Sequence, residues 1–282
     1  MNNTANNPQS NAVSHYSITD KEFSLFQTLI YDKAGISMSN AKKCLVVSRL
    51  TKRLRYFQLE NFEQYYALVM DPTNSDEMQV LVDLLTTNET YFFREEKHFD
   101  FLRDEVLARR EPGKRIRVWS AAASRGQEPY SLAMVLADKL GLDAGWELQA
   151  TDINSKVLDH AREGLYSMDE AVKIPNKLLN NWCLKGVRSQ QGSLLIDKRL
   201  RQRVDFKYLN LIGQWPDLGL FSVIFLRNVM IYFDLETKKK LVDRLRQRLE
   251  PGGYLVIGHS ETLNKVTNKL KIIQPSIYQR VD

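Results

Sequence analysis

The sequence is short of the residues by which catalytic and metal-binding proteins are most often recognised. Only two cysteines, Cys44 and Cys183, occur in 282 residues, and neither belongs to a C-x-x-C pair. This excludes a disulfide framework and a cysteine zinc site, and we expect both thiols to be buried in a reducing cytoplasm. The four histidines form no pair at i, i+4, and the G-x-S-x-G pattern of an esterase nucleophile is absent. We therefore expect neither a metal site nor a nucleophile elbow.

Long apolar runs are absent too. None approaches the roughly 18 residues that span a bilayer, so we expect no membrane insertion. Residues 1–17 are polar, are rich in Asn and Ser and lack the apolar core of a secretion signal, which predicts a disordered tail. A hydrophobic content of 43% and a charged content of 26% are ordinary for a globular protein.

Positive charge is concentrated near the N-terminus. Residues 33–59 hold seven Lys or Arg and no acid. In the helix expected over 41–56, Lys42, Arg49 and Arg53 lie within about 20° of one direction at about 100° per residue, and Lys52 borders them. These four residues, the basic stripe, are either a solvated face or a docking surface for an acidic partner. No aromatic residues interleave with them as nucleic-acid stacking requires, which argues against nucleic acid.

The periodicity predicts an α/β protein with two domains. A small all-helical N-terminal domain is expected over 18–110, where Thr19 and Glu22 form a capping box. A doubly wound, Rossmann-like parallel sheet with helices on both faces is expected over 111–282, because strand and helix patterns alternate there. Glycines and short segments interrupt the alternation over 166–203, which predicts a small inserted antiparallel β-subdomain. The expected helices are 41–56, 61–70, 76–86, 96–109, 129–140, 154–163 and 235–249, and the expected strands are 115–120, 146–151, 204–208, 221–226, 253–258 and part of 269–280.

A tight turn between the first strand and its helix is the most informative local feature. Gly126 lets a ligand approach the backbone, and Pro129 suits the first turn of a helix. The segment is neither G-x-G-x-x-G nor a phosphate loop with Gly-Lys-Ser/Thr. Glu128 stands where a phosphate would lie, so a positively charged nucleoside fits better. S-adenosylmethionine is the common ligand of that kind.

Polar residues end the other strands, where ligands bind in open α/β sheets. Asp152 is placed to accept both ribose hydroxyls, although it could instead cap the next helix. Asn210 and Leu211 could pair with and cover an adenine, although Asn after a strand is commonly turn chemistry. Arg227 and Asn228 end a buried strand, which favours a functional charge. Ser260-Glu261 reads as a helix cap.

The stretch from Asn88 to Arg94 mixes polar residues with three aromatics. If it is helical, Asn88, Tyr91 and Glu95 share one side, and Thr90 and Arg94 share another. It is either an aromatic core segment or a lid over the ligand.

Together these segments resemble the CheR family of chemotaxis receptor methyltransferases, over roughly residues 18–280. The resemblance rests on Thr87-Asn88-Glu89-Thr90-Tyr91-Phe92-Phe93-Arg94, Val118-Trp119-Ser120-Ala121-Ala122-Ala123-Ser124, Gly126-Gln127-Glu128-Pro129-Tyr130-Ser131, Ala150-Thr151-Asp152-Ile153, Asn210-Leu211 and Arg227-Asn228-Val229-Met230-Ile231-Tyr232-Phe233-Asp234. It implies a helical domain, a methyltransferase domain with an inserted β-subdomain, and S-adenosylmethionine-dependent methyl esterification of receptor glutamates.

The resemblance also implies roles for individual residues. The residues implied to contact S-adenosylmethionine, and its product S-adenosylhomocysteine, are Asn88, Thr90, Arg94, Glu128, Asp152, Asn210, Leu211, Arg227 and Asn228. Tyr232 would lie near the transferred methyl, and Arg94 and Tyr232 would orient carboxylates there. Arg125 and Gln127 depart from the smaller residue and the acid expected at those positions, which puts cofactor affinity in question.

The implied partners are the cytoplasmic helices of methyl-accepting chemotaxis receptors, with the basic stripe Lys42, Arg49, Lys52 and Arg53 docking the substrate. A receptor C-terminal tether would bind at the 166–203 insertion. Methyl transfer to a carboxylate needs no general base, because a glutamate with a pKa near 4.3 is already ionised. The alternatives are a methyltransferase acting on small molecules or nucleic acid, and a non-catalytic module that binds the cofactor and a partner helix.

Overall fold

The computed structural model describes residues 16–111 and 113–282. The tail expected over 1–17 therefore lies outside the described residues as far as residue 15, and the Tyr16 hydroxyl donates a hydrogen bond to the Leu59 carbonyl at 3.1 Å. Among the described residues, no helix combines the length and apolar character needed to cross a membrane.

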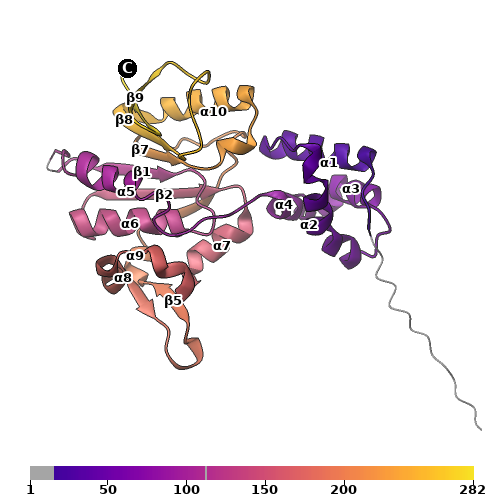
Figure 1. Ribbon diagram of the computed structural model, residues 1–282, viewed down its shortest axis with the longest axis horizontal. Helices are drawn as coiled ribbons and strands as arrows, with labels where there is room; N and C mark the ends of the chain where they lie inside the picture. The colour runs from indigo at the N-terminus through magenta and orange to yellow at the C-terminus, as the bar shows by residue number, and fades with distance from the viewer. Residues whose placement is uncertain (1–15, 112) are drawn as a thin grey trace, which may run out of the picture.

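The N-terminal part is a cluster of helices around its own core (Figure 1). Its elements are α1 (Asp20–Ala34), η1 (Asn40–Lys42), α2 (Lys43–Tyr56), α3 (Phe62–Met70), η2 (Pro72–Asn74) and α4 (Ser75–Leu85). The capping box that was expected of Thr19 and Glu22 is present at the start of α1. Phe26 and Tyr65 stack at the centre of the core with ring centroids 6.2 Å apart.

Helix α2 turns an apolar side to this core. Of the expected core residues Val47, Leu50 and Leu54, the two leucines are fully buried and Val47 is half-buried, whereas Val46 is fully buried. Cys44 is exposed on the opposite side, so the expectation that it is buried was wrong. Cys183 is half-buried, and burial raises the pKa of its thiol to about 12.

The second part is built on a seven-stranded sheet in the order β6-β2-β1-β7-β8-β10-β9. The strands are β1 (Ile116–Ser120), β2 (Trp146–Asp152), β6 (Val204–Tyr208), β7 (Phe221–Leu226), β8 (Leu249–Ile257), β9 (Leu270–Gln274) and β10 (Ile277–Arg280). The run from β6 to β8 is parallel, and β10 is antiparallel to both its neighbours. The expected doubly wound sheet is confirmed, with one antiparallel strand near its edge.

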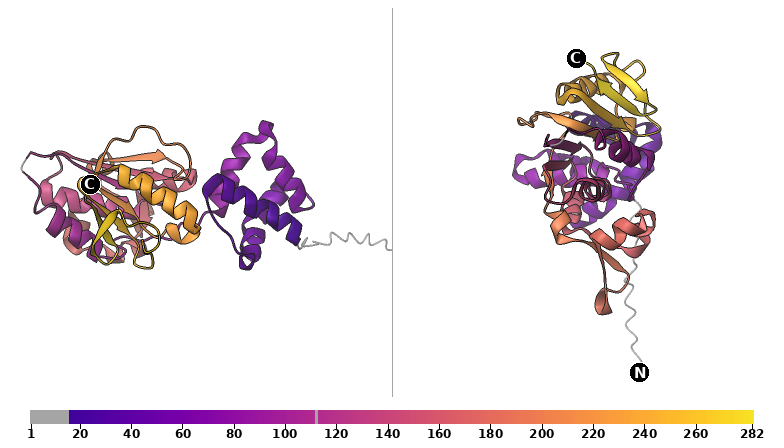
Figure 2. Two further views of the ribbon diagram at one scale, coloured as in Figure 1. Left: turned by 90° about the horizontal axis from the view of Figure 1, so that it is seen from above. Right: turned by 90° about the vertical axis from the view of Figure 1, so that its left-hand side faces the viewer.

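Alternate residues of each strand pack on opposite faces of this sheet. Val118 belongs to the core shared with α6 (Gln127–Leu140), whereas its neighbour Trp119 belongs to the core shared with α10 (Leu235–Gln247). Helix α7 (Ser155–Glu163) contacts β2, β6 and also α4 of the helical part. Figure 2 shows the helical part beside the sheet, not stacked on either of its faces.

The expected insertion is present and projects beyond α6 (Figure 1). It contains a three-stranded antiparallel sheet in the order β3-β5-β4. Its elements are β3 (Leu165–Ser167), η4 (Met168–Lys173), α8 (Asn176–Trp182), β4 (Cys183–Lys185), η5 (Arg188–Gln190), β5 (Ser193–Ile196) and α9 (Lys198–Arg201).

Residues 86–110 pack differently from the expectation that the helical domain runs to residue 110. The helical core ends at Leu85, whereas Phe92, Phe99 and Leu107 belong to the core on the α6 face of the sheet. The segment 87–94 is not helical, and α5 (Lys97–Phe101) continues into a π-helical turn at η3 (Leu102–Val106). We therefore propose that the domain boundary lies near residue 86.

Candidate active site

One deep pocket opens at the carboxyl ends of the parallel strands, against the helical domain. It encloses about 990 Å³, its open mouth included. The walls come from the ends of β1, β2 and β7, the segment after β6, the segment 85–94, and α1 with the residues just after it. The lining residues are Ala34, Ile36, Leu85, Thr86, Thr87, Asn88, Glu89, Thr90, Arg94, Ala121, Ala122, Ser124, Glu128, Asp152, Ile153, Leu209, Asn210, Leu211, Arg227, Asn228, Val229, Tyr232 and Phe233. All the residues expected to contact a cofactor are thus brought together.

The backbone of the turn at Gly126 packs closely against neighbouring residues. Gly126 has φ +94°, and a Cβ there would lie 2.8 Å from the Tyr166 hydroxyl and 2.9 Å from the Ala161 Cβ. Only glycine adopts this conformation without strain. The backbone N–H of Ser124 points inward and donates to Asp152 Oδ2 at 2.8 Å. The turn therefore positions the carboxylate that was expected to hold a ribose.

Asp152 is a buried carboxylate at the end of β2. Its Oδ1 accepts the backbone N–H of Asn154 at 2.9 Å. Helix α7 is capped by the Asn154 side chain, which accepts from the Val157 N–H, so the alternative of Asp152 as the helix cap was wrong. Burial raises the pKa of Asp152 to about 6, although these backbone hydrogen bonds oppose the shift.

Asn210 and Leu211 line the pocket, but the amide of Asn210 already has partners. It donates to the Lys33 carbonyl at 2.6 Å and accepts from the Ile212 N–H at 3.1 Å. Its carboxamide retains one N–H and one lone pair for a ligand. Part of its role is therefore to tie α1 to the sheet domain.

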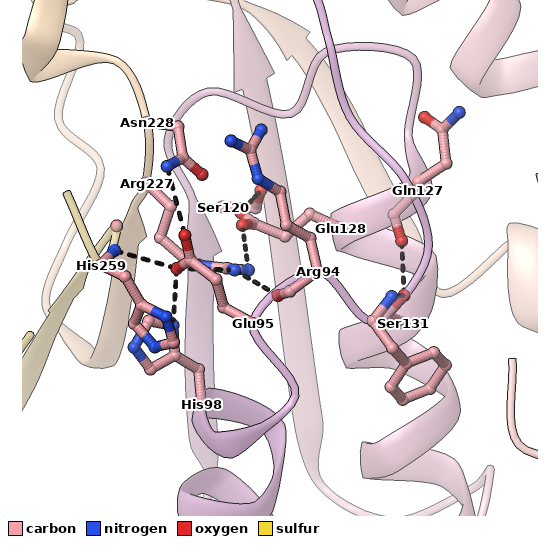
Figure 3. A network of polar contacts seen from close by, with 12 residues as sticks. Arg94, Glu95, His98, Ser120, Gln127, Glu128, Ser131, Arg227, Asn228 and His259 are labelled. Atoms are coloured by element: carbon pink, nitrogen blue, oxygen red, sulfur yellow. Dashed lines mark hydrogen bonds and ion pairs between the residues drawn. The ribbon is translucent and has the colours of Figure 1, made fainter. Parts of the chain in front are cut away.

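Arg227 and Glu128 form a buried ion pair in the wall of the pocket (Figure 3). The Arg227 Nη1 lies 2.9 Å from Glu128 Oε2, and the Ser120 hydroxyl donates to the other oxygen at 2.7 Å. Burial raises the pKa of Glu128, while the Arg227 charge opposes this. The charge of Glu128 is therefore largely compensated inside the protein, and less of it acts on a ligand than the sequence suggested.

Glu95 is the second partner of Arg227, and its role was missed from the sequence. Its Oε2 lies 3.1 Å from the guanidinium and accepts the His259 N–H at 3.2 Å, and its Oε1 accepts from the Asn228 amide at 3.3 Å. Burial opposes ionisation, but Arg227 and these hydrogen bonds hold the pKa of Glu95 below its usual value. Glu95 and Asn228 both have φ near +60°, a strained backbone that functional sites often contain.

His98 and His259 approach Glu95 closely enough for the three to share a metal ion. Burial, followed by the charge of Arg227, lowers the pKa of His98 to about 3, so its ring is neutral. The ring lies 3.4 Å from the same Glu95 oxygen that contacts Arg227. A cation there would have to compete with the guanidinium, and this geometry favours a histidine that packs behind the ion pair.

Glu261 was expected to cap a helix, but no helix follows it. Its half-buried carboxylate instead accepts three backbone N–H groups, from Gly258 at 2.6 Å, Asn228 at 2.9 Å and Met230 at 2.8 Å. Burial raises the pKa of Glu261, although these hydrogen bonds oppose the shift. This carboxylate therefore shapes the segment that carries Asn228 and Tyr232.

Arg94 and Tyr232 lie at the pocket surface. The Arg94 guanidinium donates to the Glu89 carbonyl at 3.0 Å and lies 5.8 Å from the centre of the Tyr91 ring. It pairs with no carboxylate among residues 16–111 and 113–282, in contrast to Arg227. Its charge is therefore available to a ligand.

Two of the four residues of the basic stripe make contacts within the protein. Arg53 pairs with the buried Glu77 through two contacts of 2.7 and 2.5 Å, and Glu77 also accepts from the Tyr65 hydroxyl. Arg49 donates to the Leu84 and Thr86 carbonyls. Lys42 and Lys52 are exposed. Arg53 thus holds α2 to α4 through this ion pair, and docking of a substrate by the basic stripe stays a prediction.

The helical domain is tied to the sheet domain on both sides of the pocket. On one side Asp83 accepts from the Ser155 N–H and hydroxyl at 2.9 and 2.6 Å. On the other side the Tyr31 hydroxyl donates to Asp234 at 2.6 Å, and the Ser37 N–H donates to the Tyr232 carbonyl at 2.8 Å. The sequence could not predict these contacts. Each residue is an ordinary polar residue in its own segment, and its partner lies in the other domain.

Comparison with protein families identifies both parts of the chain. A family described as CheR methyltransferase, all-alpha domain, matches residues 21–86. A family described as CheR methyltransferase, SAM binding domain, matches residues 88–278.

Individual proteins are similar over nearly the whole chain. The chemotaxis protein methyltransferase of Escherichia coli (strain K12) is 40% identical over 263 residues, which cover 93% of this chain and 91% of that protein. Chemotaxis protein methyltransferase 2 of Pseudomonas aeruginosa (strain PAO1) is 38% identical and covers 94% of each chain. Among solved structures, the N-methyltransferase NodS from Bradyrhizobium japonicum WM9 is 13% identical, with a TM-score of 0.42 over 75% of this chain and 100% of that one.

Proposed function

The chain belongs to the CheR methyltransferase family, and we propose that it transfers a methyl group from S-adenosylmethionine to glutamate side chains of chemotaxis receptors. The products are glutamyl methyl esters and S-adenosylhomocysteine, and the change in receptor charge serves sensory adaptation. We place this reaction in the cytoplasm, where the methylated receptor helices lie.

The pocket fits S-adenosylmethionine. The buried Asp152 keeps free lone pairs for ribose hydroxyls, because each oxygen accepts one backbone N–H. Ile36 and Leu211 offer apolar surface for a base, with the remaining amide capacity of Asn210 beside them. Arg94 supplies the charge that the cofactor's carboxylate or the substrate's carboxylate requires. The sulfonium supplies the electrophilic methyl group.

The protein's task is to align and desolvate the substrate carboxylate. A glutamate is ionised at neutral pH and needs no general base, and no histidine lies among the residues that line the pocket. A new bond forms between the carboxylate oxygen and the methyl carbon as the bond from carbon to sulfur breaks. Alignment of these three atoms and exclusion of water are what the site must provide.

The guanidinium of Arg94 is the observation that carries this proposal. An arginine that pairs with no carboxylate of the described residues, on the wall of a pocket that also contains Tyr232, is suited to hold a carboxylate. We assign Arg94 and Tyr232 to the reaction centre. Asn88, Thr90, Asp152, Asn210, Leu211 and Asn228 are assigned to the cofactor, and Glu128 and Arg227 to the buried pair that supports it.

The test is methyl transfer to receptor-bearing membranes from labelled S-adenosylmethionine. We expect base-labile label on receptor glutamates. Arg94→Lys keeps the charge but loses the planar fork, and Arg94→Ala loses both, so turnover should fall by roughly 10²-fold in the alanine variant and less in the lysine variant. Lys97→Ala, which removes an exposed positive charge outside the residues that line the pocket, is the matched control.

Two results would contradict the assignment. Cofactor binding without any label on receptors would favour a non-catalytic binding module. Unfolding of Arg94→Ala in circular dichroism would give Arg94 a structural role, in place of a role in alignment.

Two finer proposals concern the receptor. The exposed Lys42 and Lys52, with Arg49 between them and the pocket, form the surface for acidic receptor helices. The insertion 166–203 would hold a receptor C-terminal tether, because β4 is an edge strand that carries the exposed Leu184 and is followed by the exposed Val187. Removal of the C-terminal residues of the receptor should raise the apparent KM if the tether is used.

A further inference from the structure

Arg125 and Gln127, which flank Gly126, converge on one carboxylate of the inserted subdomain. Glu170 Oε1 lies 3.2 Å from Arg125 Nη1 and accepts from Gln127 Nε2 at 3.0 Å. The Gln127 side chain is fully buried, and Glu170 is half-buried in η4. These are the two positions at which this chain departs from the smaller residue and the acid expected of the family.

Glu170 is itself held rigidly. Its other oxygen, Oε2, accepts from the Ser167 N–H and hydroxyl at 3.1 and 3.3 Å, which closes a capping box at the start of η4. The adjacent Tyr166 hydroxyl donates to the Arg125 carbonyl at 2.7 Å. The side chains of Tyr166 and Glu170 therefore contact both the backbone and the side chains of the turn.

Residues on either side of this turn contact or line the pocket. Ser124, one residue before Arg125, donates its N–H to Asp152, and Glu128, one residue after Gln127, lines the pocket and contacts Arg227. A shift of the turn would move both carboxylates. A displacement of the order of 1 Å is enough to change binding at a site that depends on such geometry.

We propose that Glu170 is a positioning residue for the cofactor turn, and that Arg125, Gln127 and Glu170 form a compensated set. A carboxylate at position 127 would lie about 3 Å from that of Glu170 in a buried place, where like charges repel strongly. The amide of Gln127 donates there instead, and the guanidinium of Arg125 neutralises Glu170. The two departures therefore preserve cofactor affinity, and the inserted subdomain takes part in cofactor binding. This rests on the site assigned above for the proposed function.

An exchange of the amide and the acid tests the proposal. Gln127→Glu places two carboxylates together, so we expect the Kd for S-adenosylhomocysteine, measured by calorimetry, to rise about tenfold, equivalent to about 1.4 kcal/mol. Adding Glu170→Gln restores one acid and one amide with the net charge unchanged. The double variant should bind within about threefold of the original protein. The two residues are in contact, so the effects of their substitutions are not additive and should largely cancel. Asp169→Asn, an exposed neighbour on η4, is the control and should bind normally.

Amide hydrogen exchange of residues 124–128 in the ligand-free protein gives a second readout. Exchange should quicken in Gln127→Glu and return toward the original rate in the double variant. Unchanged affinity in Gln127→Glu, or a double variant weaker than either single one, would overturn the proposal. If Gln127→Glu does not fold, Glu170→Gln alone decides it, because loss of the charge facing Arg125 should still raise the Kd severalfold. Binding is measured without receptor, so a failure of receptor methylation would leave this result standing.

Discussion

Asp152 makes cofactor binding sensitive to pH within a range that enzymes experience. Burial, together with the nearby charge of Asp83, raises the pKa of Asp152 to about 6 in the ligand-free protein. Ribose hydroxyls donate hydrogen bonds to the ionised carboxylate, so a proton competes with the ligand. The affinity for S-adenosylhomocysteine should therefore be constant above pH 6 and fall below it, approaching tenfold per pH unit. Calorimetry between about pH 5 and pH 8 measures this.

Asp152→Asn provides the control. It cannot ionise, so its affinity should be weaker by about 1.5–3 kcal/mol at neutral pH and should no longer change across this range. A variant that retains the pH dependence of the original protein would show that another group is responsible, and the ribose assignment would lose its support. Circular dichroism at each pH separates binding from unfolding.

The residues of the pocket differ in how far the sequence could reveal them. Asp152 and Arg227 end buried strands, where a polar residue has few structural reasons to occur, so the sequence predicted their place in the pocket. Glu95 and Glu261 were missed as partners of that site, because their importance comes from hydrogen bonds to residues distant in the sequence. Glu95 contacts Arg227, 132 positions away, and Glu261 contacts Met230 and Asn228, 31 and 33 positions away. No local pattern encodes such distances. Asn210 was placed correctly at the pocket, but its bond to Lys33 requires the domain arrangement.

At the scale of elements, the segment after β7 depends on Glu261. Its two carboxylate oxygens accept from Gly258, Asn228 and Met230, all partly buried donors. Glu261→Ala leaves these donors without partners and should lower the free energy of unfolding by at least about 2 kcal/mol. Glu261→Gln should also destabilise, because an amide N–H would face a backbone N–H. Thermal unfolding measures both, with the exposed Glu236→Ala as the control.

The same variants separate the role of this segment from stability alone. Because Tyr232 follows it directly, Glu261→Gln should lower methyl transfer at temperatures where the protein is still folded. A variant with full stability and full activity would show that the segment is held by other contacts.

Helices α2 and α4 are joined by an ion pair whose acid is buried. Arg53→Glu would place a second carboxylate beside Glu77, which is 6% exposed, and should lower the free energy of unfolding by about 3–5 kcal/mol. Lys52→Glu, one residue earlier on the exposed side of α2, should change it by less than about 0.5 kcal/mol. Urea unfolding of the two variants makes the comparison. Equal stabilities would show that Glu77 does not need its partner.

Regular elements were predictable because their periodicity is a local property of the chain. The strands and helices of the sheet domain were found close to their predicted positions, and the insertion was found where the alternation stops. The segment 87–94 could not be predicted in the same way. Its aromatic residues have no consistent period, and Phe92 and Phe93 pack against the sheet domain instead of forming a helix. This packing is the reason for which we propose a domain boundary near residue 86.

At the scale of the molecule, the helical domain is a wall of the pocket, and we propose that it is also a surface for a partner. Asp83 and Tyr31 anchor it on either side, so Thr86, Asn88 and Thr90 face the strand ends at fixed positions. A substrate that docks on α2 thus reaches a pocket whose geometry is already set. Charge on α2 should consequently affect association and leave cofactor binding unchanged.

Reversal of the two exposed lysines tests this division of roles. Lys42→Glu with Lys52→Glu reverses the two exposed charges of the basic stripe without touching the Arg53 pair, so the protein should remain folded. The apparent KM for receptor should rise, and its dependence on salt should flatten, because charge complementarity mainly accelerates encounter and is screened by ions. The Kd for S-adenosylhomocysteine should not change. The matched control is Lys139→Glu with Lys271→Glu, two exposed lysines of the sheet domain, which changes the net charge of +6 equally. If both pairs raise the KM alike, only net charge matters. If neither does, receptor recognition lies elsewhere, most directly in the 166–203 insertion.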